Sequence, residues 1–236
     1  MTHYETNPVA IVTGVSRGFG RAFTSALLDR GWTVVGDARR AVELETTARE
    51  LNSARLITLP GDVTDAAHRA ALLDAATHAG RLGLLVNNAS RLGPSPQPVL
   101  PDYPADQLRA VYEANVFAPL ALIQAALPLL AGGVVVNVSS DAAVEPYAGW
   151  GGYGSSKAAL DQLSAVLATE ASTVAVYAFD PGDMRTEMHQ AAFPGEDISD
   201  RHEPESVVPV LLRLLDDRPV SGRYRAAELL ASGVRA

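Results

Sequence analysis

The stretch TGVSRGFG at residues 13–20 decides how this chain is organised, because it joins a strand-like segment to a helix-like one. The β-branched run Val9–Thr13 leads into it, and apolar residues at helical spacing follow over Arg21–Arg30. Its three glycines permit a tight turn and let backbone N–H groups approach a phosphate at the positive end of the helix dipole. A glycine turn can also be an ordinary connection, but its place after the first strand favours a dinucleotide-binding turn.

The rest of the chain repeats this alternation. Nearly continuous apolar runs predict five more strands, at Thr33–Gly36, Arg55–Leu59, Leu84–Asn87, Val134–Ser139 and Val174–Phe179. Helical spacing predicts further helices at Ala66–Ala79, Ala105–Leu130 and Ser155–Ala171, and Gly31 is expected to end the first helix. The pattern predicts an α/β fold: a doubly wound, Rossmann-like parallel sheet of about seven strands with helices on both faces. We expect one domain over residues 1–236, with the glycine turn in its dinucleotide-binding part.

Composition excludes several kinds of protein. The 236 residues include 19 basic and 27 acidic side chains, a net charge of −8, which argues against nucleic-acid binding. With 47% hydrophobic residues the chain can build a packed core. The absence of cysteine excludes disulfides, thiolate catalysis and sulfur-bound metals, and the five histidines form no metal-binding pair. No uninterrupted apolar run of about 20 residues and no signal peptide is present, so we expect a cytoplasmic protein without a membrane partner.

Ligands of such sheets bind at the carboxyl ends of the strands, so the loops that follow the strands are the candidate site. Two long loops, Pro94–Pro104 and Gly182–Pro204, have the length of lids or binding loops. We expect the substrate loop at about residues 182–204. The segments Arg91–Asp102, Asp141–Gly152 and Asp183–Glu203 are expected to set specificity, with an apolar lining from Leu92, Pro94, Met184, Met188 and Phe193.

Further motifs follow in order after the glycine turn, and with it they resemble the short-chain dehydrogenase/reductase family. The matching residues are Asp62-Val63, Asn87-Asn88-Ala89, Asn115, Ser140, the Tyr153/Lys157 pair, Pro181-Gly182 and Thr186. They run from residue 8 to about 190, and Ser90 stands where the family has a glycine. The resemblance implies hydride transfer between a nicotinamide dinucleotide and a carbonyl or secondary alcohol, as in carbonyl reductases and alcohol dehydrogenases.

The resemblance also implies a residue set. Catalysis is expected from Asn115, Ser140, Tyr153 and Lys157. The cofactor is expected to be held by Gly14, Ser16, Arg17, Gly18, Phe19, Gly20, Arg39, Asp62, Val63, Asn88, Ala89, Tyr153, Lys157, Pro181, Gly182 and Thr186. The family commonly forms dimers or tetramers, so a homodimer or homotetramer is expected.

The Tyr153/Lys157 pair supports this chemistry without the family. The two residues are four apart on a predicted helix and therefore share one face. A tyrosine ordinarily titrates near pH 10, and a neighbouring ammonium is expected to lower its pKa toward neutrality. A solvated surface pair is the alternative, but Lys157 is the only lysine in a chain whose other basic residues are all arginine. That choice favours a role that a guanidinium cannot fill.

Ser140 and Asn115 complete the expected catalytic set. Ser140 ends a strand thirteen residues before Tyr153, where its hydroxyl can stabilise charge on a substrate oxygen. Its neighbour Ser139 is expected to face the sheet, because successive strand residues point to opposite faces. Asn115 on its own could be a polar contact between helices. The resemblance implies that it holds a water for proton relay toward Lys157.

The cofactor is predicted to be NADP(H), with NAD(H) the alternative. An acid at the end of the second strand would bind the free adenosine 2′-hydroxyl of NAD and repel the phosphate of NADP. The family pattern puts that position at Ala38, so Asp37, one residue earlier, is expected to point away from it. Arg39 and Arg17 are then expected to bind the 2′-phosphate. In the alternative, both arginines are solvated and Asp37 reaches the ribose.

Other functions remain as alternatives. A non-catalytic dinucleotide-binding redox sensor would need the glycine turn but not Ser140, Tyr153 and Lys157. A sugar-nucleotide epimerase would need a further domain, and only 55 residues follow Pro181. Asp141 and Glu145, with Trp150, could meet a substrate amine, although acids in loops are usually solvated.

Overall fold

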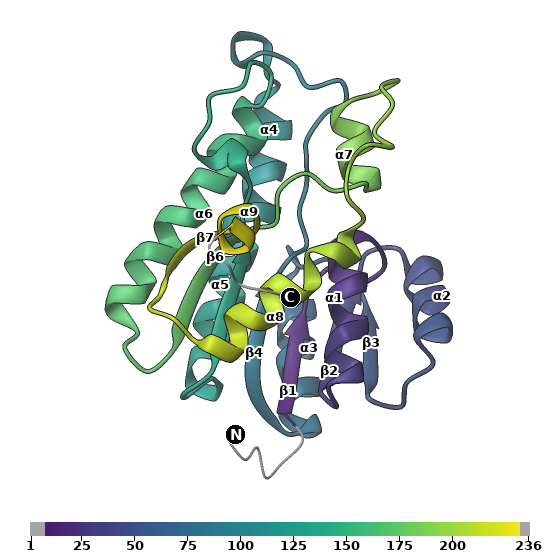
Figure 1. Ribbon diagram of the computed structural model, residues 1–236, viewed down its shortest axis with the longest axis vertical. Helices are drawn as coiled ribbons and strands as arrows, with labels where there is room; N and C mark the ends of the chain where they lie inside the picture. Colours follow the sequence, from purple (N-terminus) through teal and green to yellow (C-terminus); the bar gives the residue numbers. More distant parts are fainter. Residues whose placement is uncertain (1–7, 232–236) are drawn as a thin grey trace.

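The computed structural model describes residues 8–231, which build one seven-stranded sheet in the order β3-β2-β1-β4-β5-β6-β7 (Figure 1). The strands are β1 Pro8–Val12, β2 Thr33–Ala38, β3 Leu56–Pro60, β4 Arg81–Asn87, β5 Val134–Val138, β6 Ala175–Asp180 and β7 Gly222–Arg225. All neighbouring pairs are parallel. The strand order reverses between β1 and β4, which opens a crevice at their carboxyl ends. The predicted doubly wound parallel sheet is confirmed.

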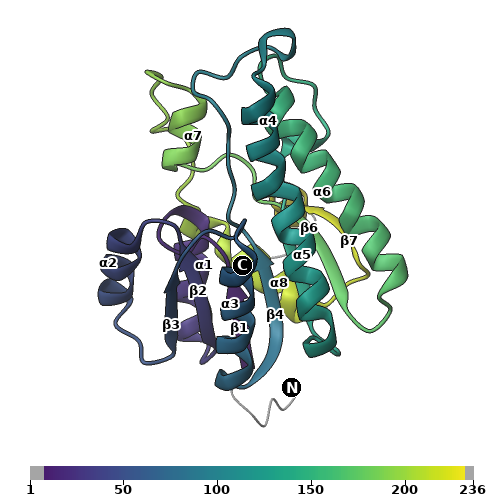
Figure 2. The same ribbon diagram turned by 180° about the vertical axis from the view of Figure 1, so that it is seen from behind.

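Helices cover both faces of this sheet (Figures 1 and 2). One face carries α1 Gly18–Asp29, α2 Ala41–Leu51 and α8 Val208–Asp217, and the other carries α3 Ala66–Ala79, α4 Ala105–Tyr112, α5 Ala118–Ala126 and α6 Gly151–Glu170. Ala10 and Val12 of β1 belong to the first core, whereas Val9 and Ile11 belong to the second. Because both faces are buried, the strand is apolar throughout instead of alternating.

The predicted helix 105–130 is interrupted in the structure. A π-helical segment, Glu113–Phe117, separates α4 from α5, and a 3₁₀ turn, Leu127–Leu129, follows α5. Pro119 lies in the first turn of α5 and has no N–H to donate, so a regular α-helix cannot run through this point. By length and composition, Ala105–Leu129 could cross a membrane, but core helices pass the same criterion. Its residues Val111 and Leu122 are buried inside the protein.

Several elements lie where the sequence pattern gave no prediction. They are α2, α8, the seventh strand β7, and the short helices α7 Glu187–Ala192 and α9 Ala226–Ala231. Strand β4 begins at Arg81, earlier than expected, with a register irregularity against β1 around Gly83. Helix α7 lies within the predicted loop 182–204 and stands beyond the carboxyl ends of the strands, across from α4 (Figures 1 and 2).

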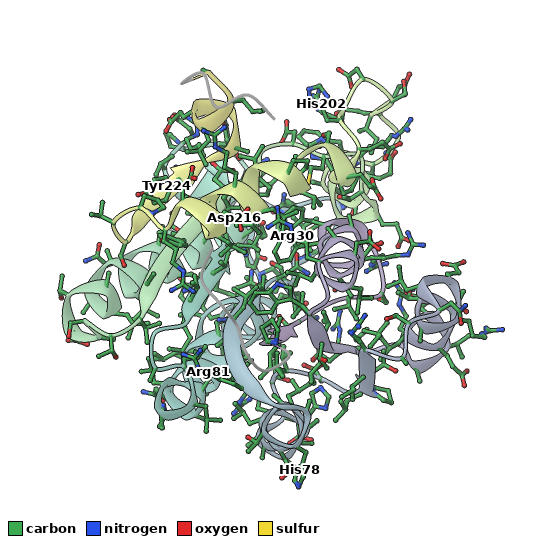
Figure 3. All side chains as sticks on the ribbon, turned by 60° about the horizontal axis from the view of Figure 1, so that its bottom comes forward. Arg30, His78, Arg81, His202, Asp216 and Tyr224 are labelled. Carbon is green, nitrogen blue, oxygen red and sulfur yellow. The ribbon has the colours of Figure 1, made fainter. Side chains whose placement is uncertain are left out.

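At the opposite end of the molecule an ion pair joins α1 to α8. Arg30, at the end of α1, contacts both carboxylate oxygens of Asp216 on α8 at 2.9 Å (Figure 3). Gly31 follows with φ of +83°, which ends α1 as predicted. The first seven residues, where we expected no signal peptide, lie outside the described range.

Candidate functional site

A cavity of about 620 Å³ lies at the carboxyl ends of the strands. It is bounded by the β1–α1 turn, by the segments that follow β2 to β6, by α6 and by α7. Every residue predicted to hold the cofactor lines this cavity except Gly20, and so do Ser140, Tyr153 and Lys157. Gly20 and Asn115 lie outside the lining and support it from behind. The structure therefore brings the predicted residues together from distant parts of the sequence.

The glycine turn is held in place by side chains from neighbouring strands. Asn88 donates from Nδ2 to the carbonyl oxygens of Thr13 and Gly14, at 2.8 and 3.1 Å. In return, the Thr13 hydroxyl accepts the backbone N–H groups of Asn88 and Ala89, at 3.0 and 2.9 Å. A Cβ on Gly20 would lie 2.3 Å from both Asn88 Nδ2 and the Gly14 oxygen. Only glycine fits there, which keeps the start of α1 close to the turn.

Asp37, at the end of β2, anchors the same turn from below. Its side chain is 2% exposed; Oδ1 accepts the Gly14 N–H at 2.8 Å, and Oδ2 lies 3.0 Å from Nε2 of His68. The hydrogen bond to Asp37 raises the pKa of His68. Nothing in the sequence pattern marked His68, because its partner is 31 residues away.

Three arginines surround this end of the cavity. Arg39 is exposed and has no hydrogen-bond or ion-pair partner within residues 8–231. Arg17 contacts the carboxylate of Glu187, the first residue of α7. Arg40, which the sequence analysis did not single out, pairs with Glu43 at 2.6 Å and lies 3.8 Å from Glu187. The cavity end near β2 is therefore rich in guanidinium groups, and α7 supplies a carboxylate to them.

Tyr153 and Lys157 project from α6 into the deepest part of the site. Lys157 is 2% exposed; its Nζ donates to the Val138 carbonyl at 2.7 Å and lies 5.6 Å from the centre of the Tyr153 ring. Burial lowers the pKa of Lys157 to about 8. Burial also raises the pKa of Tyr153, against hydrogen bonding from Ser140 and Ser90. The sequence predicted a tyrosine pKa lowered by Lys157; in this structure desolvation of the phenolate outweighs the hydrogen bonds from Ser140 and Ser90, and the pKa is raised instead.

Ser140 follows β5 beside Tyr153. Its Oγ accepts the Ala142 N–H at 3.2 Å and donates to Oδ1 of Asp141 at 3.0 Å. Its hydroxyl must therefore turn away from Asp141 before it can donate to a ligand in the cavity. Ser139 was expected to face the sheet; it is buried, but it also lines the cavity next to Ser140.

Asn115 lies in the π-helical segment, fully buried, and its side chain is saturated. Nδ2 donates to the Arg91 carbonyl and to Ser156 Oγ, both at 2.9 Å. Oδ1 accepts from the Arg91 N–H at 2.8 Å and from Ser90 Oγ at 3.2 Å. These four bonds use the full capacity of an amide, so only main-chain groups of Asn115 are left for a water. The side chain ties the loop after β4 to α6.

Comparison with known proteins agrees with this geometry. Residues 8–197 match the profile of the short chain dehydrogenase family. The chain belongs to this family.

Named relatives of this dehydrogenase include a benzil reductase ((S)-benzoin forming) from Saccharomyces cerevisiae. It is 31% identical over 215 residues, covering 86% of this chain and 80% of the relative. A serine 3-dehydrogenase from Rhizobium radiobacter is 35% identical over 183 residues, covering 75% of this chain and 72% of the relative. A short chain dehydrogenase from Shigella flexneri, solved in complex with NADP, superposes with a TM-score of 0.85. It is 28% identical and covers 94% of this chain and 98% of that one. The protein is thus a short chain dehydrogenase, an oxidoreductase, and its cavity fits a nicotinamide dinucleotide.

One wall of the dehydrogenase's cavity is apolar. Leu92, Ala142 and Tyr153 are buried there, with Trp150 and Met188 packed against them. Phe193, expected in the lining, lies behind Trp150 with ring centroids 5.7 Å apart, and Pro94 also lies outside the lining.

The two acids proposed for a substrate amine are placed differently. Asp141 lines the cavity, but its carboxylate accepts from Ser140 Oγ, from the Ala142 N–H and from Tyr147 OH. Glu145 is exposed outside the cavity lining. The protein itself therefore supplies the donors that a substrate amine would have to displace at Asp141.

Proposed function

We propose that this dehydrogenase uses NADP(H) to interconvert a carbonyl group and a secondary alcohol. The observation that carries the proposal is the meeting of Ser140, Tyr153 and Lys157 in the same cavity as the glycine turn. A protein that only sensed the dinucleotide would have no need of a buried lysine beside a buried tyrosine, since an unpaired buried charge is costly.

NADPH, when bound, supplies hydride from C4 of its nicotinamide ring to the carbonyl carbon. Tyr153 gives its phenolic proton to the oxygen on which charge develops, and the Ser140 hydroxyl donates a hydrogen bond to that oxygen. Lys157 keeps its ammonium beside Tyr153 and would hold the nicotinamide ribose of the bound cofactor. The groups expected near the nicotinamide end are Pro181, Gly182 and Thr186, which lie after β6. Asn115 supports the site through its bonds to Arg91 and Ser156.

The preference for NADP(H) rests on the charges at the β2 end of the cavity. Asp37 is already bound by Gly14 and His68, which leaves it poorly placed to accept a ribose hydroxyl. Arg39 is exposed beside the cavity, and Arg17 can exchange Glu187 for a phosphate, because both partners are partly exposed. The related Shigella flexneri structure contains NADP.

We assign the substrate to the apolar wall formed around Leu92, Trp150 and Met188, with α7 and the rest of residues 182–204 acting as the substrate loop. The relatives named above act, by their names, on benzil and on serine. The apolar wall of this chain favours a carbonyl or alcohol substrate with an apolar part.

Assembly and location belong to the same proposal. Phe117, Leu129 and Val166, which lie along the long helical stretches 105–129 and α6, are exposed apolar residues and support a homodimer or homotetramer. Size-exclusion chromatography that finds only a 24.8 kDa species would contradict this assembly. The cytoplasmic location expected in the sequence analysis also remains part of the proposal.

The test is a spectrophotometric assay with NADPH and with NADH against a panel of carbonyl compounds. We expect turnover with higher kcat/KM for NADPH, loss of most turnover in Tyr153→Phe without loss of NADPH binding, and loss of the NADPH preference in Arg39→Ala. Preference for NADH in the wild type would refute the cofactor assignment. Tight NADPH binding without turnover on any carbonyl would favour the redox sensor.

A further inference from the structure

Beneath the catalytic residues lies a cluster of buried charges that hydride transfer does not itself require. It consists of Asp161 on α6, Asp180 at the end of β6 and Arg223 on β7, and we refer to it as the buried charge cluster. The side chains of Asp180, Asp161 and Arg223 are only 2%, 13% and 24% exposed. Such charges are costly to bury unless they are paired, and here they are paired with one another.

Arg223 is the centre of the cluster. Its Nε donates to Asp161 Oδ2 at 2.9 Å, and its Nη2 donates to Asp180 Oδ2 at 2.9 Å. The same Nη2 also donates to the main-chain carbonyl of Ser140, at 3.0 Å. One rigid guanidinium thus joins the loop that carries Ser140, the strand end before Pro181 and the helix that carries Tyr153 and Lys157.

Asp180 transmits this contact toward the cavity. Its Oδ1 accepts the Gly182 N–H at 3.0 Å, so the turn after β6 is fixed by the same carboxylate that Arg223 holds. Asp161 is placed for a different effect. It lies four residues after Lys157 on α6, so both side chains share a face of the helix.

We propose that Asp161 and Arg223 are positioning residues of the active site: Asp161 keeps Lys157 protonated, and Arg223 fixes Asp161, Asp180 and Ser140 relative to one another. The effect of these two residues on kcat rests on the proposed function. The titratable and charged groups around the cluster are Tyr153, Lys157 and Asp161 of α6, Asp141 after β5, Asp180 of β6, and Arg223 and Arg225 of β7. Among the charged groups, Asp161 acts to raise the pKa of Lys157 against the lowering by burial. Burial raises the pKa of Asp161, and the hydrogen bonds of its carboxylate with the Ser139 hydroxyl and with Arg223 act against that rise and so favour the ionised form.

The sequence offers an unusually direct measurement, because Lys157 is the only lysine in the chain. Protein grown with ¹³Cε-labelled lysine gives one lysine resonance, and its chemical shift against pH reports the ionisation of Lys157 without any substrate. The Asp161→Asn variant keeps an acceptor for Arg223 but removes the charge. In this variant we expect the midpoint of the Lys157 titration to fall by about one pH unit. In Asp161→Glu, which restores the charge, we expect it to return toward the wild-type value.

Steady-state kinetics test how the two positioning residues affect turnover. We expect Asp161→Asn to lose kcat at a lower pH than the wild type, because Lys157 loses its proton at a lower pH. The KM for NADPH is expected to stay within about threefold of the wild-type value.

The role of Arg223 is tested by Arg223→Lys. This variant keeps a charge but cannot reach three acceptors, so kcat is expected to fall by about tenfold or more with little change in substrate KM. The matched control is Arg225→Lys on the same strand. Arg225 lies 3.5 Å from Asp180 and makes no contact with Ser140 or Asp161 in the described part of the chain, so its loss is expected to leave kcat within about twofold.

A Lys157 midpoint in Asp161→Asn that stays within about 0.3 of the wild-type value, or rises, would overturn the role of Asp161. Equal losses of kcat in Arg223→Lys and Arg225→Lys would overturn the role of Arg223. Circular dichroism confirms that each variant is folded. If Asp161→Asn does not fold, the Lys157 midpoint in Asp161→Glu decides, and a shift of about one pH unit there contradicts the proposal. A wild type without turnover on any carbonyl would contradict the proposed function, but it would leave the Lys157 titration to be judged on its own.

Discussion

Replacing the buried Lys157 by methionine is expected to stabilise the protein while it destroys turnover. A methionine matches the length and flexibility of the lysine chain and needs no charged partner. The ammonium of Lys157, by contrast, is almost completely buried, and its one hydrogen bond to a protein group in the described residues goes to the Val138 carbonyl. Function and stability are therefore expected to conflict at this position.

The magnitude follows from the pKa of Lys157. Its ordinary value is 10.5, and burial lowers it to about 8 in the folded protein. At 1.36 kcal/mol per pH unit, this difference disfavours folding by about 3 kcal/mol at pH 7, where the unfolded chain binds its proton more tightly. Loss of the hydrogen bond to Val138 costs about 1 kcal/mol. We therefore expect Lys157→Met to be about 2 kcal/mol more stable than the wild type at pH 7.

The sign of the pH dependence provides the test. Between pH 8 and 10.5 the unfolded chain binds more protons at Lys157 than the folded protein, so wild-type stability from this group rises with pH. Urea unfolding of the wild type and of Lys157→Met at pH 7 and pH 10 is expected to show the advantage of the variant disappearing at the higher pH. Tyr153→Phe, which keeps Lys157, serves as the control and is expected to behave as the wild type. A variant that is less stable at pH 7, or an equal difference at both pH values, would refute the reasoning.

Three further outcomes are expected. Gly20→Ala places a Cβ 2.3 Å from two polar atoms of the glycine turn region and is expected to weaken NADPH binding at least about tenfold by calorimetry, whereas Gly222→Ala, with its nearest contact at 3.8 Å, is expected to bind normally. Pairing with Asp37 raises the pKa of His68 in the folded protein above its ordinary value of 6.5. The pairing therefore stabilises the protein fully below about pH 6.5, and less as the pH rises through the pKa of His68 in the folded protein. The stability lost in His68→Gln is therefore expected to shrink between pH 6 and pH 8.5, and a constant loss in urea unfolding would contradict the pairing. Ser140→Ala is expected to lower kcat by roughly 10²–10³ with unchanged NADPH affinity, and unaltered kcat would remove this residue from the catalytic set.

Local patterns were sufficient for the part of the fold that is buried on both faces. The strands up to β6 could be predicted because each is a continuous apolar run. Strand β7 could not, because its sequence GRYR is polar and only its pairing with β6 makes it a strand. The long helix 105–130 was predicted as one element because apolar spacing continues across Pro119, whereas the backbone changes to a π-helix just before it.

In the candidate site, too, local motifs could be predicted from the sequence and long-range contacts could not. The residues that line the cavity follow short motifs and could be placed from the sequence. The contacts that support them join residues far apart, such as Arg223 to Asp161 and Asp180, 62 and 43 positions away. The pKa of Tyr153 shows the same limit, because the spacing to Lys157 is visible in the sequence but the burial of both groups is a property of the fold.

The most direct test of the proposed chemistry follows the hydride itself. NADPH carrying deuterium at C4, in its pro-R and pro-S forms, is incubated with the enzyme and a carbonyl substrate found in the panel, and the alcohol is analysed by mass spectrometry. We expect one of the two forms to place a single deuterium on the former carbonyl carbon, at a rate that falls by roughly 10² or more in Tyr153→Phe. An alcohol free of deuterium with both forms, or equal rates in the wild type and Tyr153→Phe, would contradict hydride transfer assisted by Tyr153.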